Sequence, residues 1–504
     1  MPIITESHVE ETALAILEDI GYQILHGPDI TEGGPNPERK YSDVILTERL
    51  RKALAKINPK IPAEEREKAL KQILRTSSQN MAVNNSDFHK MAVDGVDIEY
   101  RKDSRIVGDK VWLFDFDKPE NNEFLAINQF TIIENRGNIE NRRPDIILFV
   151  NGIPLVIIEL KNIADEDTTI KDAFNQFQTY KLLIPGIFRY NEILVGSDGN
   201  QAKAGTITSE WERFIPWKDK DAEKSKITQM EVLLREMLNK KTLLDLIRHF
   251  IVFEENKDGL QKKIAAYHQY YAVNKAIKTT KEAVKGDKRA GVVWHTQGSG
   301  KSLSMVFYAG KLVLDLDNPT ILMLTDRNDL DGQLFDTFSK AQELLRQKPA
   351  QADSRDELKK LLKVASGGII FTTIQKFLPD EKGGKFPLLS DRSNIVVVAD
   401  EAHRSQYDFI DGFAKHLRDA LPNASFIGFT GTPIEKADKN TPAVFGDYVD
   451  VYDIHQSYID GTTVKIYYES RLAKLELKPE ERPKIDANFE EVTEGEETAN
   501  KEKL

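Results

Sequence analysis

The chain has 504 residues, a formal net charge of −11 and no cysteine. At about 150 residues per domain, this length predicts about three domains, and the lack of cysteine excludes disulfides and thiolate metal sites. The acidic balance excludes a uniformly basic coat for nucleic acid, although a local basic groove is still able to bind DNA.

The N-terminal residues predict a helix over 6–24 and show no targeting signal. They lack the basic flank and apolar core of a signal peptide. No apolar run in the chain approaches the roughly 20 residues that span a bilayer. We therefore expect a soluble, cytoplasmic protein that does not contact a membrane.

Residues 110–160 contain several strand-like runs, namely WLFDF, FLAINQFTII, DIILFV and LVIIEL. A helix around Phe174 and Phe177 follows, and then the strand EILVGSDG. Strands mixed with helices in this way predict an α/β domain with helices flanking a sheet. We place this first domain at residues 1–200.

The stretch RRPDIILFVNGIPLVIIELKN, residues 142–162, reads as a buried hairpin with charges at both ends. Asp145, Glu159 and Lys161 have the PD…ExK spacing of a large nuclease superfamily. Two carboxylates suit Mg²⁺, and a divalent cation is what phosphodiester cleavage needs. The alternative is an ordinary surface hairpin with solvated charged ends.

The register of this hairpin tests the metal-site hypothesis. A regular two-residue turn at Asn151-Gly152 would place Asp145 and Glu159 on opposite faces of the sheet. A three-residue loop that pairs Phe149 with Ile153 would place both carboxylates on one face. We therefore predict a bulge, or another shift by one residue, in this hairpin.

Residues 201–260 are predicted to link two domains. Gly, Thr, Ser and charged residues break the regular pattern between 199 and 221, and 230–253 resembles one long bridging helix. From about 265 onward, short apolar strands alternate with helical stretches, which predicts βαβ units and a parallel sheet. We place this second α/β domain at residues 261–460.

The motif WHTQGSGKS, residues 294–302, follows a strand and opens a helix, as a phosphate-binding loop does. Glycines let backbone N–H groups approach the phosphates, and the helix N-terminus favours negative charge. His295 occupies the position where the simple pattern has glycine. Seven residues are candidates for nucleotide binding, with Ser302 also a Mg²⁺ ligand: Thr296, Gln297, Gly298, Ser299, Gly300, Lys301 and Ser302.

Two further motifs follow later strands of the predicted parallel sheet. NIVVVADEAH places Asp400 and Glu401 at a strand end, where Asp400 would hold Mg²⁺ and Glu401 would activate water. FIGFTGTP places Thr430 and Thr432 after another strand. Either motif alone is compatible with an ordinary turn, but their combination with the phosphate loop favours an ATPase.

Together these motifs resemble motifs I, II (the DEAH box) and III of superfamily 2 helicases. The resemblance implies that His403, Thr430 and Thr432 couple nucleotide state to the grip on DNA. It implies that residues 325–333 and 372–377 contact the DNA backbone. It also implies that Gln269 reads adenine, against the alternative of a polar residue on an aromatic-rich helix.

The motif AFNQFQTY places Gln176 and Tyr180 four residues apart and resembles the QxxxY motif of RecB-like nucleases. Together with the PD…ExK residues and the DEAH motor, it makes nearly the whole chain resemble the restriction (motor and nuclease) subunit of type I restriction-modification enzymes. The implied fold is an N-terminal PD-(D/E)xK nuclease domain followed by a RecA-like superfamily 2 helicase domain. By the same resemblance, Glu10 matches a glutamate near the nuclease site, with a solvated charge as the alternative.

The resemblance implies ATP-driven translocation on double-stranded DNA, coupled to Mg²⁺-dependent cleavage. The methylation and specificity subunits would be the partners, and S-adenosylmethionine would bind only to them. The chain departs from the family because motifs of the second helicase domain are missing, and residues 461–504 read as its start and an acidic tail. Two alternatives stay open: a helicase or remodelling ATPase with a non-cleaving DNA-binding domain, and a non-enzymatic assembly module.

Overall fold

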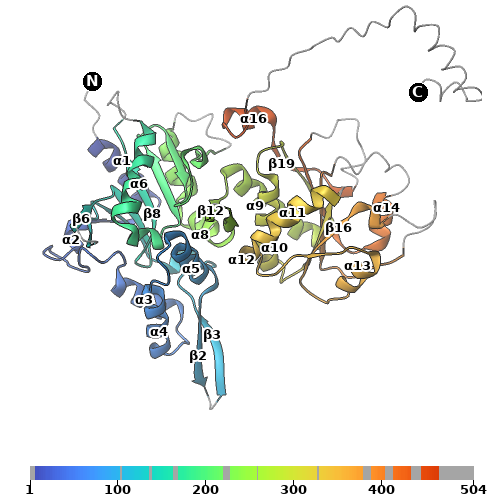
Figure 1. Ribbon diagram of the computed structural model, residues 1–504, viewed down its shortest axis with the longest axis horizontal. Helices are drawn as coiled ribbons and strands as arrows, with labels where there is room; N and C mark the ends of the chain where they lie inside the picture. Colours follow the sequence, from blue (N-terminus) through green and yellow to red (C-terminus); the bar gives the residue numbers. More distant parts are fainter. Residues whose placement is uncertain are drawn as a thin grey trace, which may run out of the picture. The chain divides into compact units, whose positions relative to one another are not determined.

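The computed structural model describes residues 6–102, 105–135, 139–162, 169–219, 227–257, 259–325, 328–377, 387–402, 413–432 and 444–464. The chain packs as one unit over Met1–Thr462. Two large sheets organise this unit, and Figure 1 shows each with its helices.

The first sheet has six strands in the order β1-β4-β7-β8-β9-β10. Pairs β1–β4 and β8–β9 are parallel, and the other neighbours are antiparallel. Every residue of β7 and β8 is buried, which is why this hairpin reads as an apolar run. The strands are β1 (Gln23–His26), β4 (Phe124–Asn128), β7 (Ile146–Val150), β8 (Ile153–Leu160), β9 (Ile193–Ser197) and β10 (Ala202–Gly205).

Two helices accompany the strands of the first sheet that carry the predicted nuclease residues. Helix α1 (Glu6–Asp19) ends earlier than the sequence predicted, because β1 begins at Gln23. Helix α6 (Ile170–Leu183) begins with a capping box between Thr169 and Asp172. The expected strand WLFDF is absent over the described residues 112–116, and the next strands begin at Phe124 and, for β5 (Ile132–Asn135), at Ile132.

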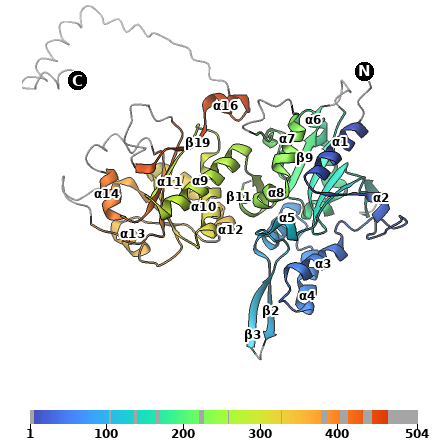
Figure 2. The ribbon, with the colours of Figure 1, turned by 180° about the vertical axis from the view of Figure 1, so that it is seen from behind.

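A subdomain made of helices and a separate two-stranded ribbon is inserted between β1 and β4. The ribbon pairs β2 (Val96–Lys102) with β3 (Arg105–Val111) and belongs to neither large sheet. Figures 1 and 2 show its distal end extending beyond the helices beside it. The helices of the insertion are α2 (Gly27–Ile30), α3 (Thr47–Ile57), α4 (Ala63–Leu74) and α5 (Met81–Asp94).

The single long helix predicted over 230–253 is wrong. The chain instead forms α7 (Gln229–Val232), a π-helical turn and then α8 (Lys240–His249), whose N-cap Asn239 accepts from Thr242 N–H. A strand, β11 (Ile251–Asn256), follows directly and pairs with β12 (Gly259–Ile264). Asn239 is a helix-start signal, so it marks where the predicted helix is interrupted.

The second large sheet confirms the predicted parallel α/β domain. Its order is β15-β16-β14-β17-β18-β13-β19, and all neighbouring pairs are parallel. Parallel neighbours require crossovers, which the helices between them supply. The strands are β13 (Arg289–His295), β14 (Thr320–Thr325), β15 (Ala350–Gln351), β16 (Ile369–Thr373), β17 (Ile395–Asp400), β18 (Ser425–Thr430) and β19 (Tyr448–Tyr452).

Helices precede and follow the strands of the second sheet along the chain. Two long ones flank β13, with α9 before it and α10 after it. In the part of the chain that the structure describes, no helix is both long and apolar enough to cross a bilayer. The helices are α9 (Tyr267–Lys285), α10 (Lys301–Asp315), α11 (Asn328–Lys340), α12 (Gln342–Leu345), α13 (Arg355–Leu361), α14 (Phe413–Ala420) and α16 (Ile454–Ile459).

Candidate functional site

The hairpin β7–β8 contains the predicted one-residue shift, but not in the predicted place. Val150 pairs with Ile153 across a two-residue turn, so the three-residue loop is wrong. Asn151 and Gly152 both have positive φ, at 53° and 80°, as this tight turn requires. The shift lies further along, between the pairs Phe149–Pro154 and Leu148–Val156.

This shift leaves Leu155 as the extra residue of a β-bulge. Beyond it, Ile146 pairs with Ile158, and the same register places Asp145 opposite Glu159. Without the bulge the two carboxylates would lie on opposite faces. The register prediction is therefore confirmed, although the device is a bulge in β8 rather than a longer turn.

Four side chains converge where this hairpin ends. Asp145 Oδ2 accepts a hydrogen bond from Leu160 N–H at 2.7 Å, which fixes the carboxylate against β8. Lys161 Nζ donates to Glu159 Oε1 at 2.8 Å, and Tyr180 OH donates to Glu159 Oε2 at 3.1 Å. Both Glu159 oxygens are thereby oriented, one by a cation and one by a hydroxyl from α6.

The electrostatics of this group are those of a site that would bind a cation. Burial, and then repulsion from Glu159, raises the pKa of Asp145 to about 8. Burial likewise raises the pKa of Glu159, against the opposing effect of Lys161. Burial lowers the pKa of Lys161, but Glu159 outweighs it, so the net shift is upward. Two buried carboxylates with one lysine form a negative site when ionised.

Helix α6 supplies the two residues of the QxxxY motif. Tyr180 is buried, and burial raises the pKa of its phenol, so the hydroxyl keeps its proton and stays a donor to Glu159. A hydrogen bond with Gln176 opposes that shift, so the two residues are adjacent. The structure therefore brings the i, i+4 pair to the carboxylates, while the roles of both residues stay predictions.

Helix α1 places two glutamates near the end of the hairpin, the expected Glu10 and also Glu6. Glu10 accepts from Asn128 Nδ2 at 2.7 Å and from Gln129 Nε2 at 2.9 Å, so it supports the loop after β4. Glu6, one helical turn earlier, lies 4.0 Å from Lys161 Nζ and raises the pKa of Asp145. Glu6 and Glu10 are four residues apart on α1, so they lie on the same side of the helix, and this spacing could have indicated both.

The residues fit a hard divalent cation, with two protein carboxylates as its ligands. Oxygen ligands suit Mg²⁺, which usually keeps several waters and is held by one or two carboxylates. Among the described residues, no group of three or more His, Asp and Glu side chains is placed to hold a metal ion. Asp145 and Glu159 would therefore supply the protein ligands, with water and phosphate completing the shell.

The phosphate loop lies between β13 and α10, where the sequence placed it. Gly298 and Gly300 have φ of 87° and 84°, and Gly300 is the residue before the helix. These left-handed conformations favour glycine. The loop is braced from within, because Ser299 Oγ donates to Thr296 O at 2.6 Å. Gln297 and Gly298 are exposed, so they line its outer side.

Lys301 joins the phosphate loop to the DEAH segment. Its Nζ lies 2.5 Å from Glu401 Oε1 and 2.9 Å from Asp400 Oδ1. Glu401 itself has φ of 49°, a conformation that costs a non-glycine residue energy and that clusters at functional sites. One ammonium group thus lies between both acidic residues that the sequence singled out, and a bound phosphate would compete with them for this cation.

The third motif, at residues 430–432, contacts the Glu401 carboxylate. Gly431 N–H donates to Glu401 Oε2 at 3.4 Å. The Thr430 hydroxyl donates to Thr432 O at 3.1 Å and holds the turn after β18. The carboxyl ends of β13, β17 and β18 are adjacent in the sheet, which explains why motifs about 130 residues apart meet. His403 lies outside the described residues.

Gln269 lies at the start of α9, against the phosphate loop. Its Oε1 accepts from Ala266 N–H at 2.9 Å, and its Nε2 donates to Gly300 O at 3.0 Å. The neighbouring His268 Nε2 lies 3.0 Å from Ser299 O. Gln269 therefore supports the loop directly in this structure, and its role in reading adenine stays a prediction.

His295 explains the missing glycine of the motif. It is the last residue of β13, fully buried, and its Nε2 lies 3.2 Å from Asp450 Oδ2 on β19. The position is therefore part of the sheet, in extended conformation, and does not need glycine. Sequence reasoning missed Asp450 because no local motif marks it.

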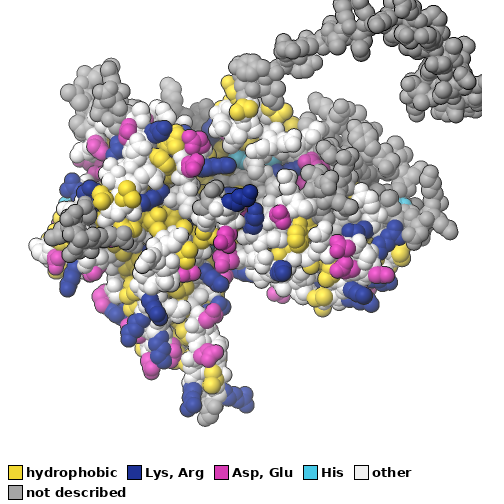
Figure 3. All heavy atoms as spheres, in the orientation of Figure 1, with side chains coloured by type: hydrophobic (Ala, Val, Ile, Leu, Met, Phe, Trp, Pro, Cys, Tyr) yellow, Lys and Arg dark blue, Asp and Glu magenta, His cyan; other side chains and the backbone are white. Residues whose placement is uncertain are grey.

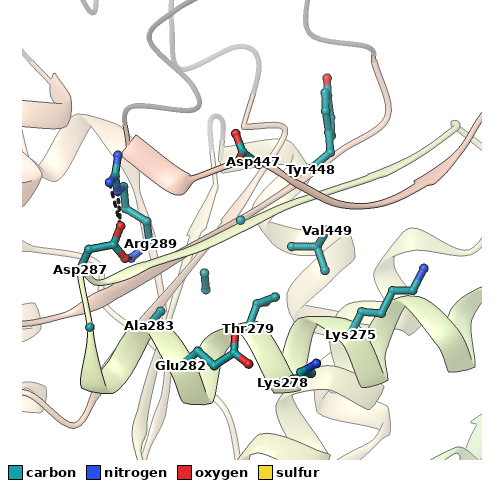
Figure 4. Close-up of a pocket in the computed structure, with 13 residues that line it drawn as sticks. Lys275, Lys278, Thr279, Glu282, Ala283, Asp287, Arg289, Asp447, Tyr448 and Val449 are labelled. Atoms are coloured by element: carbon teal, nitrogen blue, oxygen red, sulfur yellow. Dashed lines mark hydrogen bonds and ion pairs between the residues drawn. The ribbon is translucent and has the colours of Figure 1, made fainter.

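A cavity of about 640 Å³ lies beside α9, between that helix and strands β13 and β19 (Figure 4). Its lining includes Arg289 and Gly291 at the amino end of β13, whereas the phosphate loop follows the carboxyl end. Asp287 and Arg289 form an ion pair across its rim. The cavity belongs to neither of the two candidate sites.

Comparison with known proteins matches each half of the chain to a separate family model. Residues 3–213 match the model of the type I restriction enzyme R protein N terminus. Residues 268–502 match the SWI2/SNF2 ATPase model. The first match contains the carboxylate pair, and the second contains the phosphate loop and both acidic residues, Asp400 and Glu401, at the end of β17.

Two curated relatives align with almost the whole chain. The type I restriction enzyme HindI endonuclease subunit of Haemophilus influenzae is 45% identical over 97% of this chain and 48% of its own length. A putative type I restriction enzyme MjaIXP endonuclease subunit of Methanocaldococcus jannaschii is 38% identical over 96% of this chain and 48% of its own. The chain thus spans about half the length of the curated relatives it matches.

Proposed function

The chain belongs to the family of type I restriction enzyme endonuclease subunits, and we propose that it carries the nuclease and motor functions of such a subunit. In this proposal the N-terminal domain, of the PD-(D/E)xK kind, cleaves double-stranded DNA with Mg²⁺. The second domain binds ATP and drives translocation of the DNA. Methylation and specificity subunits would be the partners, and they would hold S-adenosylmethionine.

The bulge at Leu155 is the observation that carries the nuclease proposal. It aligns Asp145 with Glu159 at the end of a fully buried hairpin. Core packing does not explain why two buried carboxylates lie opposite each other, because burial disfavours their charged forms. A bound cation reverses that penalty, which supports a metal site rather than solvated hairpin ends.

The residues around the hairpin would divide the work of cleavage. Asp145 and Glu159 would hold Mg²⁺, which when bound neutralises charge on the phosphate and lowers the pKa of water. Lys161, 2.8 Å from Glu159, would position the attacking water or stabilise the charge that develops. Tyr180 would keep Glu159 oriented through its hydroxyl.

The phosphate loop supports nucleotide binding in the second domain. Lys301 would exchange its carboxylate partners for the β- and γ-phosphates, while backbone N–H groups of the loop contact the same phosphates. Ser302 and Asp400 would hold the Mg²⁺ that accompanies ATP, and Glu401 would then be released to orient water. Thr430, Thr432 and His403 would transmit the nucleotide state to the DNA contacts.

Plasmid cleavage tests the nuclease proposal. The chain, alone and with its partner subunits, is incubated with supercoiled plasmid and Mg²⁺. We expect Asp145→Ala and Lys161→Ala to lower the cleavage rate at least 100-fold without changing the affinity for an ATP analogue. Asp117→Ala is the matched control, because Asp117 is an exposed carboxylate that pairs with Arg248. Cleavage that persists in both variants, or a wild-type chain that never cuts, would contradict the proposal.

A further inference from the structure

The ribbon β2–β3 is built differently from the other strands of the N-terminal domain. It pairs over seven residues a side and joins no larger sheet. Its buried residues, Val96, Ile98 and Val111, all lie at the base. An isolated two-stranded ribbon is marginally stable in water, so the distal half contributes little to folding stability. A binding role is a better reason for its length.

The distal end of the ribbon carries cations and one exposed apolar side chain. Arg101 pairs with Ile106 across the ribbon, and Arg105, the first residue of β3, directly precedes Ile106. Both arginines are exposed, and no hydrogen bond or ion pair links either guanidinium to another residue that the structure describes. Ile106 is 70% exposed. Figure 3 shows Lys and Arg side chains gathered at this end.

The acidic side chains that the structure describes in β2 and β3 lie nearer the base of the ribbon. Asp97 pairs with Lys110 at 2.9 Å, and Tyr100 OH donates to Asp109 at 3.4 Å. Glu99 is on the same face as Arg101, two pairs closer to the base. Among the described residues of the ribbon, positive charge is therefore concentrated towards its distal end.

The helices beside the ribbon extend the basic surface. Residues 47–75, which form α3 and α4, contain nine Lys and Arg but four Asp and Glu, in a chain of net charge −11. Lys52, Lys60, Lys71 and Arg75 are exposed. A local positive surface on an acidic protein attracts a polyanion.

We propose that the distal ribbon is a DNA-binding finger, in which Arg101 and Arg105 bind phosphates of double-stranded DNA and Ile106 enters a groove. A two-stranded ribbon fits the major groove, which is about 12 Å wide, and apolar side chains also wedge between base steps. Exposed arginines suit phosphate because they donate in a planar fork. This inference rests on the proposed function, since it assumes that DNA is the substrate, but it uses none of the metal-site residues.

Salt dependence of DNA binding tests the finger. Anisotropy of a labelled duplex of about 30 base pairs is measured with the whole chain, in EDTA and without nucleotide. Removing two phosphate contacts with Arg101→Gln/Arg105→Gln should lower the slope of log affinity against log salt by about 1.8. Ile106→Ser should weaken binding several-fold at every salt concentration and leave the slope unchanged.

The matched control is Lys359→Gln/Lys360→Gln, which removes two exposed cations from α13. It should leave both slope and affinity unchanged. Unaltered slopes in the arginine variant would overturn the finger, as would variants that bind DNA normally but no longer associate with the partner subunits. The plasmid assay separates the two proposals: if the wild type never cuts but the arginine variant still shows the lower salt slope, the nuclease proposal fails while the finger stands.

Discussion

Replacing Asp145 with asparagine should stabilise the metal-free protein, although it destroys the proposed metal site. The pKa of Asp145 rises from 3.8 to about 8 on folding, through burial and the nearby Glu159. At about pH 7 the unfolded chain is ionised and the folded one largely protonated. The difference corresponds to at most about 4 kcal/mol, at about 1.36 kcal/mol per pH unit.

The expected gain is smaller than this limit. Asp145 keeps part of its surface in water and lies near Lys161, so roughly 2 kcal/mol is a reasonable expectation for Asp145→Asn. The asparagine oxygen is still able to accept from Leu160 N–H, so the hairpin keeps its hydrogen bond. Its amide carries no charge, so the repulsion between Asp145 and Glu159 is removed.

The sign of the pH dependence follows from the raised pKa. The folded state binds more protons than the unfolded state between about pH 4 and about pH 8, so wild-type stability in EDTA falls as pH rises through this window. Asp145→Asn should flatten that slope. Adding Mg²⁺ should stabilise the wild type increasingly as pH rises, because the ion replaces a proton.

Hydrogen exchange of the β7 and β8 amides, measured at several pH values with EDTA, reports local stability without assuming a two-state transition. Asp172→Asn is the opposite control, because hydrogen bonds from Thr169 lower the pKa of Asp172, so that variant should lose stability. Faster exchange in Asp145→Asn, or an unchanged pH slope, would refute the account of a repulsive carboxylate pair.

Three further variants test the two sites. Tyr180→Phe leaves a buried Glu159 oxygen without its hydrogen bond, which costs about 1–3 kcal/mol. The cleavage rate should therefore fall about 10- to 100-fold, while binding of the ATP analogue is unchanged. An unaltered cleavage rate would argue against a positioning role for Tyr180. Lys301→Ala should abolish binding of a labelled ATP analogue, while the Mg²⁺-induced stabilisation of β7–β8 persists; retained binding would contradict the phosphate-loop assignment. Gly300→Ala should weaken nucleotide binding at least 10-fold by titration calorimetry, because φ is +84° and the added Cβ would lie 2.7 Å from Gln269 Nε2; normal affinity would show that the loop relaxes.

Periodicity was sufficient to predict the parallel sheet of the second domain. Five apolar runs became β13, β14, β16, β17 and β18, because each strand is buried and bounded by turn or helix signals. Sequence spacing could not give the strand order, which depends on long-range pairing. That order places the phosphate loop beside the DEAH segment.

The hairpin shows where local reasoning reaches its limit. Chemistry required a one-residue shift, and the shift exists, but turn rules favoured a loop where the chain uses a bulge. Pro154 was the missed signal: it has no N–H for the ladder, and proline within sheets is found at edges and bulges. Glu6 was missed for a related reason, since which turn of α1 faces the hairpin is set by tertiary packing.

The most direct test of the central claim is the position of a bound metal ion. Crystals of the wild-type chain soaked in Mn²⁺, which substitutes for Mg²⁺ and scatters anomalously, would locate the ion without any assay of activity. The account predicts one ion coordinated by both Asp145 and Glu159, lost in Asp145→Asn. An ion bound elsewhere, or two carboxylates that stay unligated at saturating Mn²⁺, would contradict it.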